Sequence, residues 1–538
     1  MNHPPSPRSN LLRMKWIVLT LCFLCAIHCA SAGGNILVII ADDYGIDGNS
    51  LYNTSPSAVL PPTPKINELA ANGIRFTNAY AYPLCSPTRS CMLTGRYGFR
   101  TGTGDVVSMA ANNSLKATEF TLPDAFAANP SLGYQLKHFG KWHLTAGPNN
   151  KAPSTIGGWP AYAGSLAGEV ASYTNWTKVI TDGTTPGTSS STSTTYATTD
   201  VVNDAVPWIQ SQTVANKPWF AWVAFNAPHF PTHLPTPTSL CPHYTNLSGT
   251  TNDINNNRLS YYNAMVEAMD TEIGRLLDVV NYSTTTVIFI GDNGTNLQVL
   301  QTPFPSGHGK DTLYEGGVRV PMIIRGASVV APGRISPVLT HVVDLYATIL
   351  EIAGINLATT IPRDVILDSK SLLPILQNQT PMSSRLYSES FDASVPTSGG
   401  RVLRDDQYKL IRNATGTDEF YDLLNDPYES TNLVTGGVNA MTLERQNYYH
   451  RLRYDLGRYT SSTTPVANNV LIQNGSFRIT VPKNATTPQT LYRCTDLKND
   501  FWAPVNGATY TVSGSSITFT DPDPPATRAF YSVLTDAP

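Results

Sequence analysis

Two pairs of oxygen-bearing side chains follow apolar runs that are typical of buried strands. Asp42 and Asp43 come after the run ILVII, and Asp292 and Asn293 come after VIFI. Three carboxylates brought together repel one another unless a cation lies among them, and a donor set made only of oxygen favours Ca²⁺ or Mg²⁺ over zinc. The alternative is ordinary turn and helix-cap chemistry, because Asp and Asn are common where strands end.

A second set of candidates is cationic. Lys141 and His143 lie in GKWHL, His229 closes the run WFAWVAFNAPH, and Lys310 lies in SGHGKDTLYEGG, where glycines let the backbone bend closely around a ligand. Two lysines and two histidines beside a divalent cation suit a tetrahedral oxyanion such as sulfate or phosphate. Taken singly, each is read as a surface charge or a structural histidine.

The stretch CSPTRSCMLTGRY, residues 85–97, places Cys85 ahead of Pro87 and Arg89. A thiol nucleophile at Cys85 would require a lowered pKa, which a sequence does not show. Three of the seven cysteines lie near the N-terminus, and an even number in the rest of an exported chain ordinarily predicts two disulfides. The four that follow the N-terminal segment are Cys85, Cys91, Cys241 and Cys494.

The secondary-structure pattern is that of an α/β fold. Four strand-like segments, NILVII, QLKHF, WFAWVAF and TTVIFI, each run up to polar residues, and the continuous apolar runs among them predict a sheet that is covered on both faces. Helical spacing occurs over residues 261–280 and in HVVDLYATILEIAG, which ends on Gly354 as a capped helix would. Ligands of such sheets gather beyond the carboxyl ends of the strands, so the candidate residues are expected to meet in one cleft.

The first 32 residues have the pattern of a secretory signal peptide. Three basic residues precede WIVLTLCFLCAI, and ASA offers a cleavage site. The apolar run is shorter than the roughly 20 residues of a membrane-spanning helix, so an uncleaved anchor is the alternative, and no later run is long enough. We expect a secreted, periplasmic or cell-surface protein. Cleavage removes three cations and takes the formal charge from −3 to −6, which gives no support to nucleic-acid binding.

The segment CSPTRSCMLTGRY resembles the signature of the type I, formylglycine-dependent sulfatases, Cys-x-Pro-Ser/Thr-Arg followed by Leu-Thr-Gly-Arg. ADD, GKWHL, PHFP, GDNG, GKDTLYEGGVRVP and EFYDLLNDPYESTNL occur in the order of that family, over about residues 35–433. Thr88 stands where Ser is more usual and Thr145 where Gly is common, and neither removes a catalytic group. Cys91 replaces a small apolar residue and is read as a buried thiol or as a partner of Cys241 or Cys494.

The resemblance implies that a formylglycine-generating enzyme reads Pro87 and Arg89 and oxidises Cys85 to an aldehyde. The aldehyde hydrates to a diol, one hydroxyl attacks the sulfur of a sulfate ester, and collapse of the sulfated hemiacetal expels sulfate. Ca²⁺, with Mg²⁺ as the alternative, would lie beside the modified residue. Its implied ligands are Asp42, Asp43, Asp292, Asn293 and the modified Cys85.

The resemblance assigns the other candidates as well. Arg89 would hold the modified side chain after folding. Lys141 and His143 would lie beside the diol, with His143 as the base for its collapse. His229 and Lys310 would bind the sulfate, and one of them would protonate the leaving oxygen.

The fold implied is that of the alkaline phosphatase superfamily: a large mixed sheet flanked by helices, then a smaller subdomain with a four-stranded antiparallel sheet and a packed helix. We expect a signal peptide at 1–32, a catalytic α/β domain at 33–380, the C-terminal subdomain at 381–462, and an all-β module at 466–538. The module is read as a cap, a surface-attachment module or a glycan-binding module. The Ser/Thr-rich residues 181–200 are interpreted as a surface loop.

The sequence therefore predicts an exported sulfatase that acts on a sulfated polysaccharide or a small aryl sulfate. Two alternatives stay open. One is a phosphodiesterase or phosphonate monoester hydrolase that uses the same aldehyde, and the other is a catalytically silent protein whose β-module binds polysaccharide. Neither the sugar nor the oligomeric state follows from the residues.

Overall fold

The computed structural model describes residues 34–146, 151–182, 189–379, 386–392, 395–460, 469–473, 476–483, 489–494, 502–525 and 529–535. The expected signal peptide, residues 1–32, lies outside the described residues. In the part of the chain that is described, no helix is both long and apolar enough to cross a membrane.

A ten-stranded sheet with the order β11-β2-β10-β9-β1-β8-β4-β5-β6-β7 forms the centre of the protein. Its four middle strands run parallel, and they are the four that the sequence predicts: β9 (Thr285–Gly291), β1 (Asn35–Ala41), β8 (Trp219–Ala224) and β4 (Gln135–Gly140). The outer strands are β11 (Arg334–Ser336), β2 (Ile74–Phe76), β10 (Met322–Gly326), β5 (Tyr162–Gly164), β6 (Trp176–Thr181) and β7 (Ser189–Ser193).

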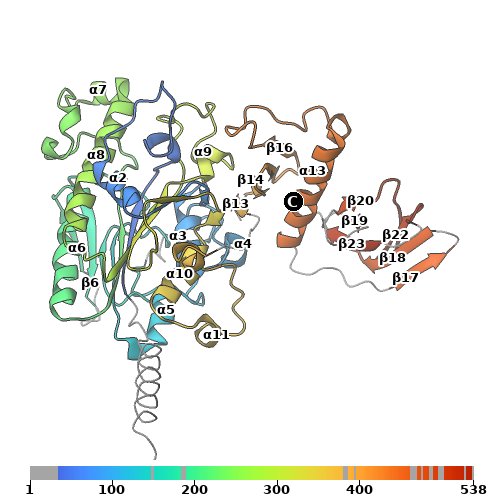
Figure 1. Ribbon diagram of the computed structural model, residues 1–538, viewed down its shortest axis with the longest axis horizontal. Coiled ribbons are helices and arrows are strands. Elements are labelled where there is room, and N and C mark those ends of the chain that lie inside the picture. The colour runs from blue at the N-terminus through green and yellow to red at the C-terminus, as the bar shows by residue number, and fades with distance from the viewer. Residues whose placement is uncertain are drawn as a thin grey trace, which may run out of the picture.

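Helices cover both faces of this sheet, which explains why its central strands are apolar without alternation (Figure 1). Ile36, Val38 and Ile40 of β1 pack in one core cluster, and Leu37 and Ile39 pack in the other. The first cluster includes α3 (Cys85–Thr94), α5 (Leu122–Ala127) and α10 (Asp344–Ile352), and the second includes α2 (Pro64–Ala71), α6 (Ala197–Val214) and α8 (Arg258–Leu277). The two helices that the sequence predicts are confirmed as α8 and α10.

Part of the Ser/Thr-rich stretch forms regular secondary structure, and residues 183–188 of it lie outside the described residues. Residues 189–193 form β7, the edge strand that pairs antiparallel with β6, and α6 begins at Ala197. The surface-loop interpretation is wrong for these residues because an edge strand is held by its backbone hydrogen bonds and needs no apolar side chains. The side chains of β7 are largely exposed, so no hydrophobic pattern marks the strand in the sequence.

After the large sheet comes a four-stranded antiparallel sheet with the order β13-β14-β15-β16. Helix α13 (Leu443–Thr460) packs on it, with Leu452 and Leu456 in the same core cluster as Leu403 and Leu410. The strands are β13 (Leu386–Asp392), β14 (Val395–Arg404), β15 (Tyr408–Asn413) and β16 (Asp418–Asp422). This arrangement confirms the expected sheet and helix of the smaller subdomain.

The last part of the chain is all-β, as expected, and forms two small sheets, β17-β18-β22-β21 and β20-β19-β23. Its own core includes Val481, Leu491 and Phe519. Tyr454 of α13 stacks on Trp502 with 4.5 Å between the ring centroids, so the module packs against that helix (Figure 1). The strands are β17 (Asn469–Gln473), β18 (Ser476–Pro482), β19 (Gln489–Cys494), β20 (Ala503–Pro504), β21 (Thr509–Ser513), β22 (Ser516–Asp521) and β23 (Phe530–Thr535).

Short elements connect these parts. The helices are α4 (Gly98–Thr101), α7 (Thr251–Asn256), α9 (Glu315–Val318), α11 (Leu357–Thr360) and α12 (Leu373–Leu376), and β3 (Ala79–Tyr80) pairs with β12 (Thr340–His341). The 3₁₀ turns are Ile46–Gly48, Pro130–Leu132, Thr238–Leu240, Pro242–Tyr244 and Val438–Ala440.

A buried charge network joins the catalytic sheet to the smaller subdomain. Lys409 of β15 lies 3.0 Å from Glu315 of α9 and 2.8 Å from Glu429, and all three are buried. The Tyr80 hydroxyl donates to Glu315 at 2.6 Å. Burial and the neighbouring Glu315 raise the pKa of Glu429 despite Lys409. Because Arg404 and Arg319 also face Glu315, Glu429 is the carboxylate that depends on the lysine for compensation.

We therefore expect Lys409→Met to lower the free energy of unfolding by about 3–5 kcal/mol, because it leaves the buried carboxylate of Glu429 without its cation. Arg445→Met is the matched control in the same subdomain. Arg445 is 36% exposed and lies 3.7 Å from Asp422, so its loss is expected to cost no more than about 1 kcal/mol. Urea denaturation measures both, and equal losses would contradict the structural role of the network.

Candidate active site

The polar residues that follow the parallel strands meet at one edge of the sheet. Asp42 and Asp43 follow β1, and Asp292 follows β9, the strand paired with β1. The Asp43 backbone N–H donates to Asp292 Oδ1 at 3.1 Å, and this bond helps to hold Asp43 in the left-handed region at φ 62°. Because the strands are parallel, their carboxyl ends bring together residues that are about 250 positions apart.

Cys85 is the first residue of α3, and its side chain points into this edge. Its Sγ lies 3.2 Å from His143 Nδ1, and the Sγ forms one close group with carboxylate oxygens of Asp42 and Asp292. Burial raises the pKa of the Cys85 thiol, although Lys141 and Lys310 act against that effect. Burial therefore disfavours the thiolate form that a cysteine nucleophile would require.

Arg89 lies one helical turn after Cys85 and fixes two neighbouring segments. Its Nη2 donates to Asp292 Oδ2 at 2.7 Å, and its Nη1 donates to the Lys141 carbonyl at 3.0 Å. The guanidinium is fully buried. Arg89 thus ties α3 to the ends of both β9 and β4, which orients the helix that presents residue 85.

The acidic residues have the properties of a cation site. Lys141 Nζ lies 2.5 Å from Asp42 Oδ2, yet burial and the charge of Asp292 still raise the pKa of Asp42 to about 6. Asp42 Oδ1, Asp43 Oδ2 and Asn293 Oδ1 are buried and accept no hydrogen bond from the described residues. Buried oxygens without donors are costly unless a cation faces them, so the donor set fits a hard divalent ion.

Lys310 and His229 both face Asp43. Lys310 Nζ lies 2.6 Å from Asp43 Oδ1, and His229 Nε2 lies 3.8 Å from Asp43 Oδ2. His229 Nδ1 lies 2.8 Å from the Phe230 carbonyl, which only accepts, so Nδ1 carries the proton and Nε2 faces the site. Burial alone would raise the pKa of Asp43, but Lys310 and His229 outweigh it and lower that pKa.

His143 is held tightly and in an uncharged state. Its backbone is in the left-handed region at φ 54°, and its N–H donates to the Leu166 carbonyl at 3.1 Å. Burial and the nearby Lys141 and Arg89 lower the pKa of His143 well below its ordinary value. A Cβ at position 168 would lie 2.4 Å from the ring, so only Gly168 leaves room for it. A neutral imidazole against residue 85 is suited to accept a proton there.

Every candidate from the sequence thus lies in this one group: Asp42, Asp43, Cys85, Arg89, Lys141, His143, His229, Asp292, Asn293 and Lys310. Two residues that hold this group in place were not predicted from the sequence. Ser86 Oγ donates to the His143 carbonyl at 2.9 Å, and the Thr295 carbonyl accepts from the Lys310 N–H at 2.9 Å. Ser86 lies inside the Cys85 motif and Thr295 follows GDNG, so their positions beside these motifs were the only sequence signal of their roles.

The two-disulfide interpretation is wrong. Cys85, Cys91 and Cys241 are buried free thiols in the described part of the chain. Cys91 packs among Met92, Leu93 and other apolar residues of the main core, so the alternative of a buried thiol at this position is confirmed.

Comparison with known proteins agrees with this site. A sulfatase family model matches residues 34–355, and a model of the C-terminal region of N-sulphoglucosamine sulphohydrolase matches residues 307–452. Both models describe a class of enzymes that is named for the hydrolysis of sulfate groups. Within that class the chain belongs to the sulfatase family, because the family model covers more than half of it.

Individual relatives are distant. N-acetylgalactosamine-6-sulfatase of Canis lupus familiaris is 28% identical over 64% of this chain, and the match spans 66% of that relative, just under two thirds of its length. Human arylsulfatase A is 27% identical over 76% of this chain and 85% of its own.

Solved structures share the fold. Ps i-CgsB, solved in complex with k-i-k-neocarrahexaose, superposes with a TM-score of 0.65 at 22% identity over 80% of this chain and 93% of its own. BT4656, solved with its substrate D-glucosamine-2-N,6-O-disulfate, gives 0.61 at 20% identity over 80% and 98%. The phosphonate monoester hydrolase of Agrobacterium radiobacter gives 0.57 at 20% identity over 80% and 96%. At these identities the likeness establishes the α/β fold, in agreement with the expected fold class.

Proposed function

We propose that the protein hydrolyses sulfate esters to an alcohol and inorganic sulfate, with residue 85 as the nucleophile after its oxidation to formylglycine. The observation that carries the proposal is the position of Cys85, whose Sγ lies in one group with Asp42, Asp292 and His143. The raised pKa of the thiol argues against direct use of the cysteine, and the hydrated aldehyde supplies a hydroxyl nucleophile in its place.

The proposed cofactor is Ca²⁺, held by the carboxylates of Asp42, Asp43 and Asp292, the amide oxygen of Asn293 and the modified side chain of residue 85. The support is the set of buried oxygens that lack hydrogen-bond donors. A bound cation would absorb negative charge on the sulfuryl oxygens and favour the deprotonated nucleophile.

The basic residues of the site have different proposed roles. Arg89 orients α3 and thereby residue 85, and Lys141 balances Asp42. His143, neutral and 3.2 Å from Cys85 Sγ, accepts the proton that leaves residue 85 when sulfate is expelled. Lys310 and His229, the two basic side chains that face Asp43, bind the sulfate, and one of them supplies the proton for the leaving oxygen.

The proposed substrate is a sulfated glycan that the protein meets outside the cytoplasm. Relatives are named for hydrolysing the 6-sulfate of N-acetylgalactosamine, and proteins of the same fold were solved with a neocarrahexaose and with a disulfated glucosamine. The signal-peptide pattern of residues 1–32 supports export, and the CSPTR motif supports maturation by a formylglycine-generating enzyme. For the module at 466–538, its packing on α13 favours a structural cap.

The test combines two measurements on protein made in its own host. Mass spectrometry of the peptide that contains residue 85 should find the aldehyde, and an intact thiol would contradict the mechanism and favour a silent binding protein. Turnover of 4-nitrophenyl sulfate should exceed that of 4-nitrophenyl phenylphosphonate. The reverse preference would assign the protein to the phosphonate monoester hydrolases.

Ion binding should also raise the stability of the folded protein. We expect saturating Ca²⁺ to stabilise the EGTA-treated protein by about 2.7 kcal/mol at a concentration 100 times the dissociation constant, because the folded state alone assembles the site. Differential scanning calorimetry measures the gain, and Mg²⁺ should give less. Asp292→Asn should remove most of it, whereas Asp278→Asn, an exposed control at the end of α8, should leave it intact. No stabilisation by either ion would overturn the cation site.

A further inference from the structure

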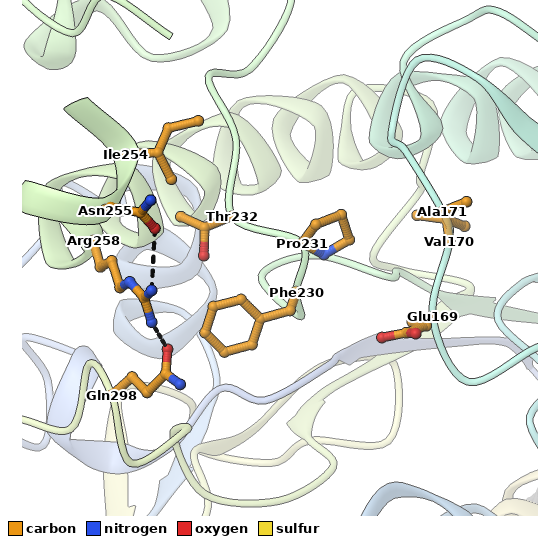
Figure 2. Close-up of a pocket in the computed structure, with 10 residues that line it drawn as sticks. All are labelled: Glu169, Val170, Ala171, Phe230, Pro231, Thr232, Ile254, Asn255, Arg258 and Gln298. Carbon is orange, nitrogen blue, oxygen red and sulfur yellow. Dashed lines mark hydrogen bonds between the residues drawn. The ribbon is translucent and has the colours of Figure 1, made fainter. Parts of the chain in front are cut away.

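A pocket of about 380 Å³ adjoins the proposed catalytic group, and none of its residues has a role in the chemistry above (Figure 2). Its volume is in the range of sites that take small ligands, and it mixes an aromatic ring with a few polar groups. The side chains that matter for its chemistry are Glu169, Phe230, Asn255, Arg258 and Gln298.

Two walls of the pocket continue directly from catalytic residues. Phe230 follows His229, and the Phe230 carbonyl lies 2.8 Å from His229 Nδ1. Glu169 follows Gly168, whose backbone lies against the His143 ring. A molecule that fills the pocket is therefore adjacent to the groups that would bind the sulfate ester.

The third wall of the pocket also continues from a segment that holds a catalytic side chain. Gln298 lies three residues after Thr295, whose carbonyl accepts the backbone N–H of Lys310 at 2.9 Å. Three chain segments that hold catalytic side chains thus continue into the pocket. This connection indicates that the pocket receives the rest of the substrate rather than an unrelated ligand.

Arg258 gives the pocket its charge. It is the first residue of α8, and its guanidinium donates to Asn255 Oδ1 at 3.1 Å and to Gln298 Oε1 (Figure 2). Among the described residues, no carboxylate pairs with it, whereas Arg275 farther along the same helix pairs with Glu272 at 2.7 Å. A guanidinium is always charged and has five N–H donors, so two amide acceptors orient Arg258 without neutralising it.

The rest of the pocket suits a sugar. The Phe230 ring lies between Arg258 and Glu169 in the view of Figure 2 and offers a flat apolar surface. Glu169 is exposed and makes no ion pair with Arg258, so its oxygens are available to accept hydrogen bonds from hydroxyl groups. A sugar that has an anionic substituent at one end and hydroxyl groups at the other matches this arrangement.

We propose that the pocket is a second anion subsite: Arg258 binds a further sulfate or carboxylate group of a sulfated saccharide while its scissile sulfate lies at residue 85. The inference rests on the proposed function, since it names the part of the substrate that the chemistry does not touch. It makes Arg258 a specificity-determining residue that selects substrates with at least two negative charges.

The test is calorimetric binding to Cys85→Ala protein, which has no nucleophile at residue 85. Three probes are compared: glucosamine 6-sulfate, D-glucosamine-2-N,6-O-disulfate, and the unsaturated chondroitin 6-sulfate disaccharide, which has a carboxylate in addition to one sulfate. At least one of the two dianionic probes should bind about tenfold more tightly than the monosulfate, as one charge-assisted pair provides. The dianionic probe that binds more tightly identifies the second group as sulfate or carboxylate.

Added to this background, Arg258→Gln should remove the preference and change monosulfate affinity less than twofold, and Arg258→Lys should keep part of the preference. Arg275→Gln, on the same helix, is the control and should change nothing. Equal binding of all three probes, or a preference that survives Arg258→Gln, would overturn the subsite. Binding requires no turnover, so failure of the proposed reaction would appear separately, as absent sulfate release by the Cys85 enzyme.

Discussion

Cys85→Ala is expected to lower turnover of sulfate esters by at least about 1,000-fold, because no other group among the described residues is in place to attack sulfur. The residue is buried at the first position of α3, and His143 and the acidic cluster converge on it. Sulfate release measured by ion chromatography would show the loss. Substantial turnover by Cys85→Ala would contradict the assignment of residue 85 as the nucleophile.

Two further variants separate the nucleophile from the fold. If serine stays unconverted, Cys85→Ser has a single hydroxyl that can accept the sulfuryl group but cannot expel it, so intact-protein mass spectrometry should find one trapped sulfuryl group. Cys91→Ala lies on the same helix and removes a buried thiol that faces the apolar core. That control should retain turnover per folded molecule, and a loss comparable to Cys85→Ala would indicate a packing effect instead.

The sequence predicted the centre of the fold well because burial of a strand on both faces leaves a direct apolar pattern in its sequence. Strands covered on both faces must be apolar throughout, so β1, β8 and β9 stand out as continuous runs. Once they are taken as parallel, the convergence of Asp42 with Asp292 follows from geometry. The resemblance to the family motif then predicted a role for Cys85 other than the disulfide that cysteine counting alone indicates.

What the sequence did not predict depends on contacts between distant segments. Gly168 resembles any loop glycine until the His143 ring is placed against it. Arg258 resembles a solvated helix residue, and only the fold brings it beside Gln298 and Phe230. The edge strand β7 was hidden because exposed backbone pairing leaves no periodic signal.

Lys310→Ala should lower turnover of 4-nitrophenyl sulfate by about 100-fold or more while the protein stays folded, because it removes a positive charge aimed at the developing negative charge. Lys310 Nζ lies 2.6 Å from Asp43, and the charge of Asp43 outweighs burial and raises the pKa of Lys310. The lysine is therefore charged in the free enzyme. Lys217→Ala, an exposed residue at the amino end of β8 and so at the opposite edge of the sheet, is the matched control and should be neutral.

Comparison of Lys310→Ala with His229→Ala shows which of the two residues donates the proton to the leaving oxygen. Nitrophenolate leaves without protonation, whereas a sugar alkoxide needs a proton, so the variant that lacks the acid should lose far more activity on a sulfated sugar than on the aryl sulfate. The variant that lacks only a sulfate contact should lose similar factors on both. Near-normal activity of Lys310→Ala on both substrates would overturn its contact with the sulfate, and circular dichroism of each variant excludes misfolding as the cause of a loss.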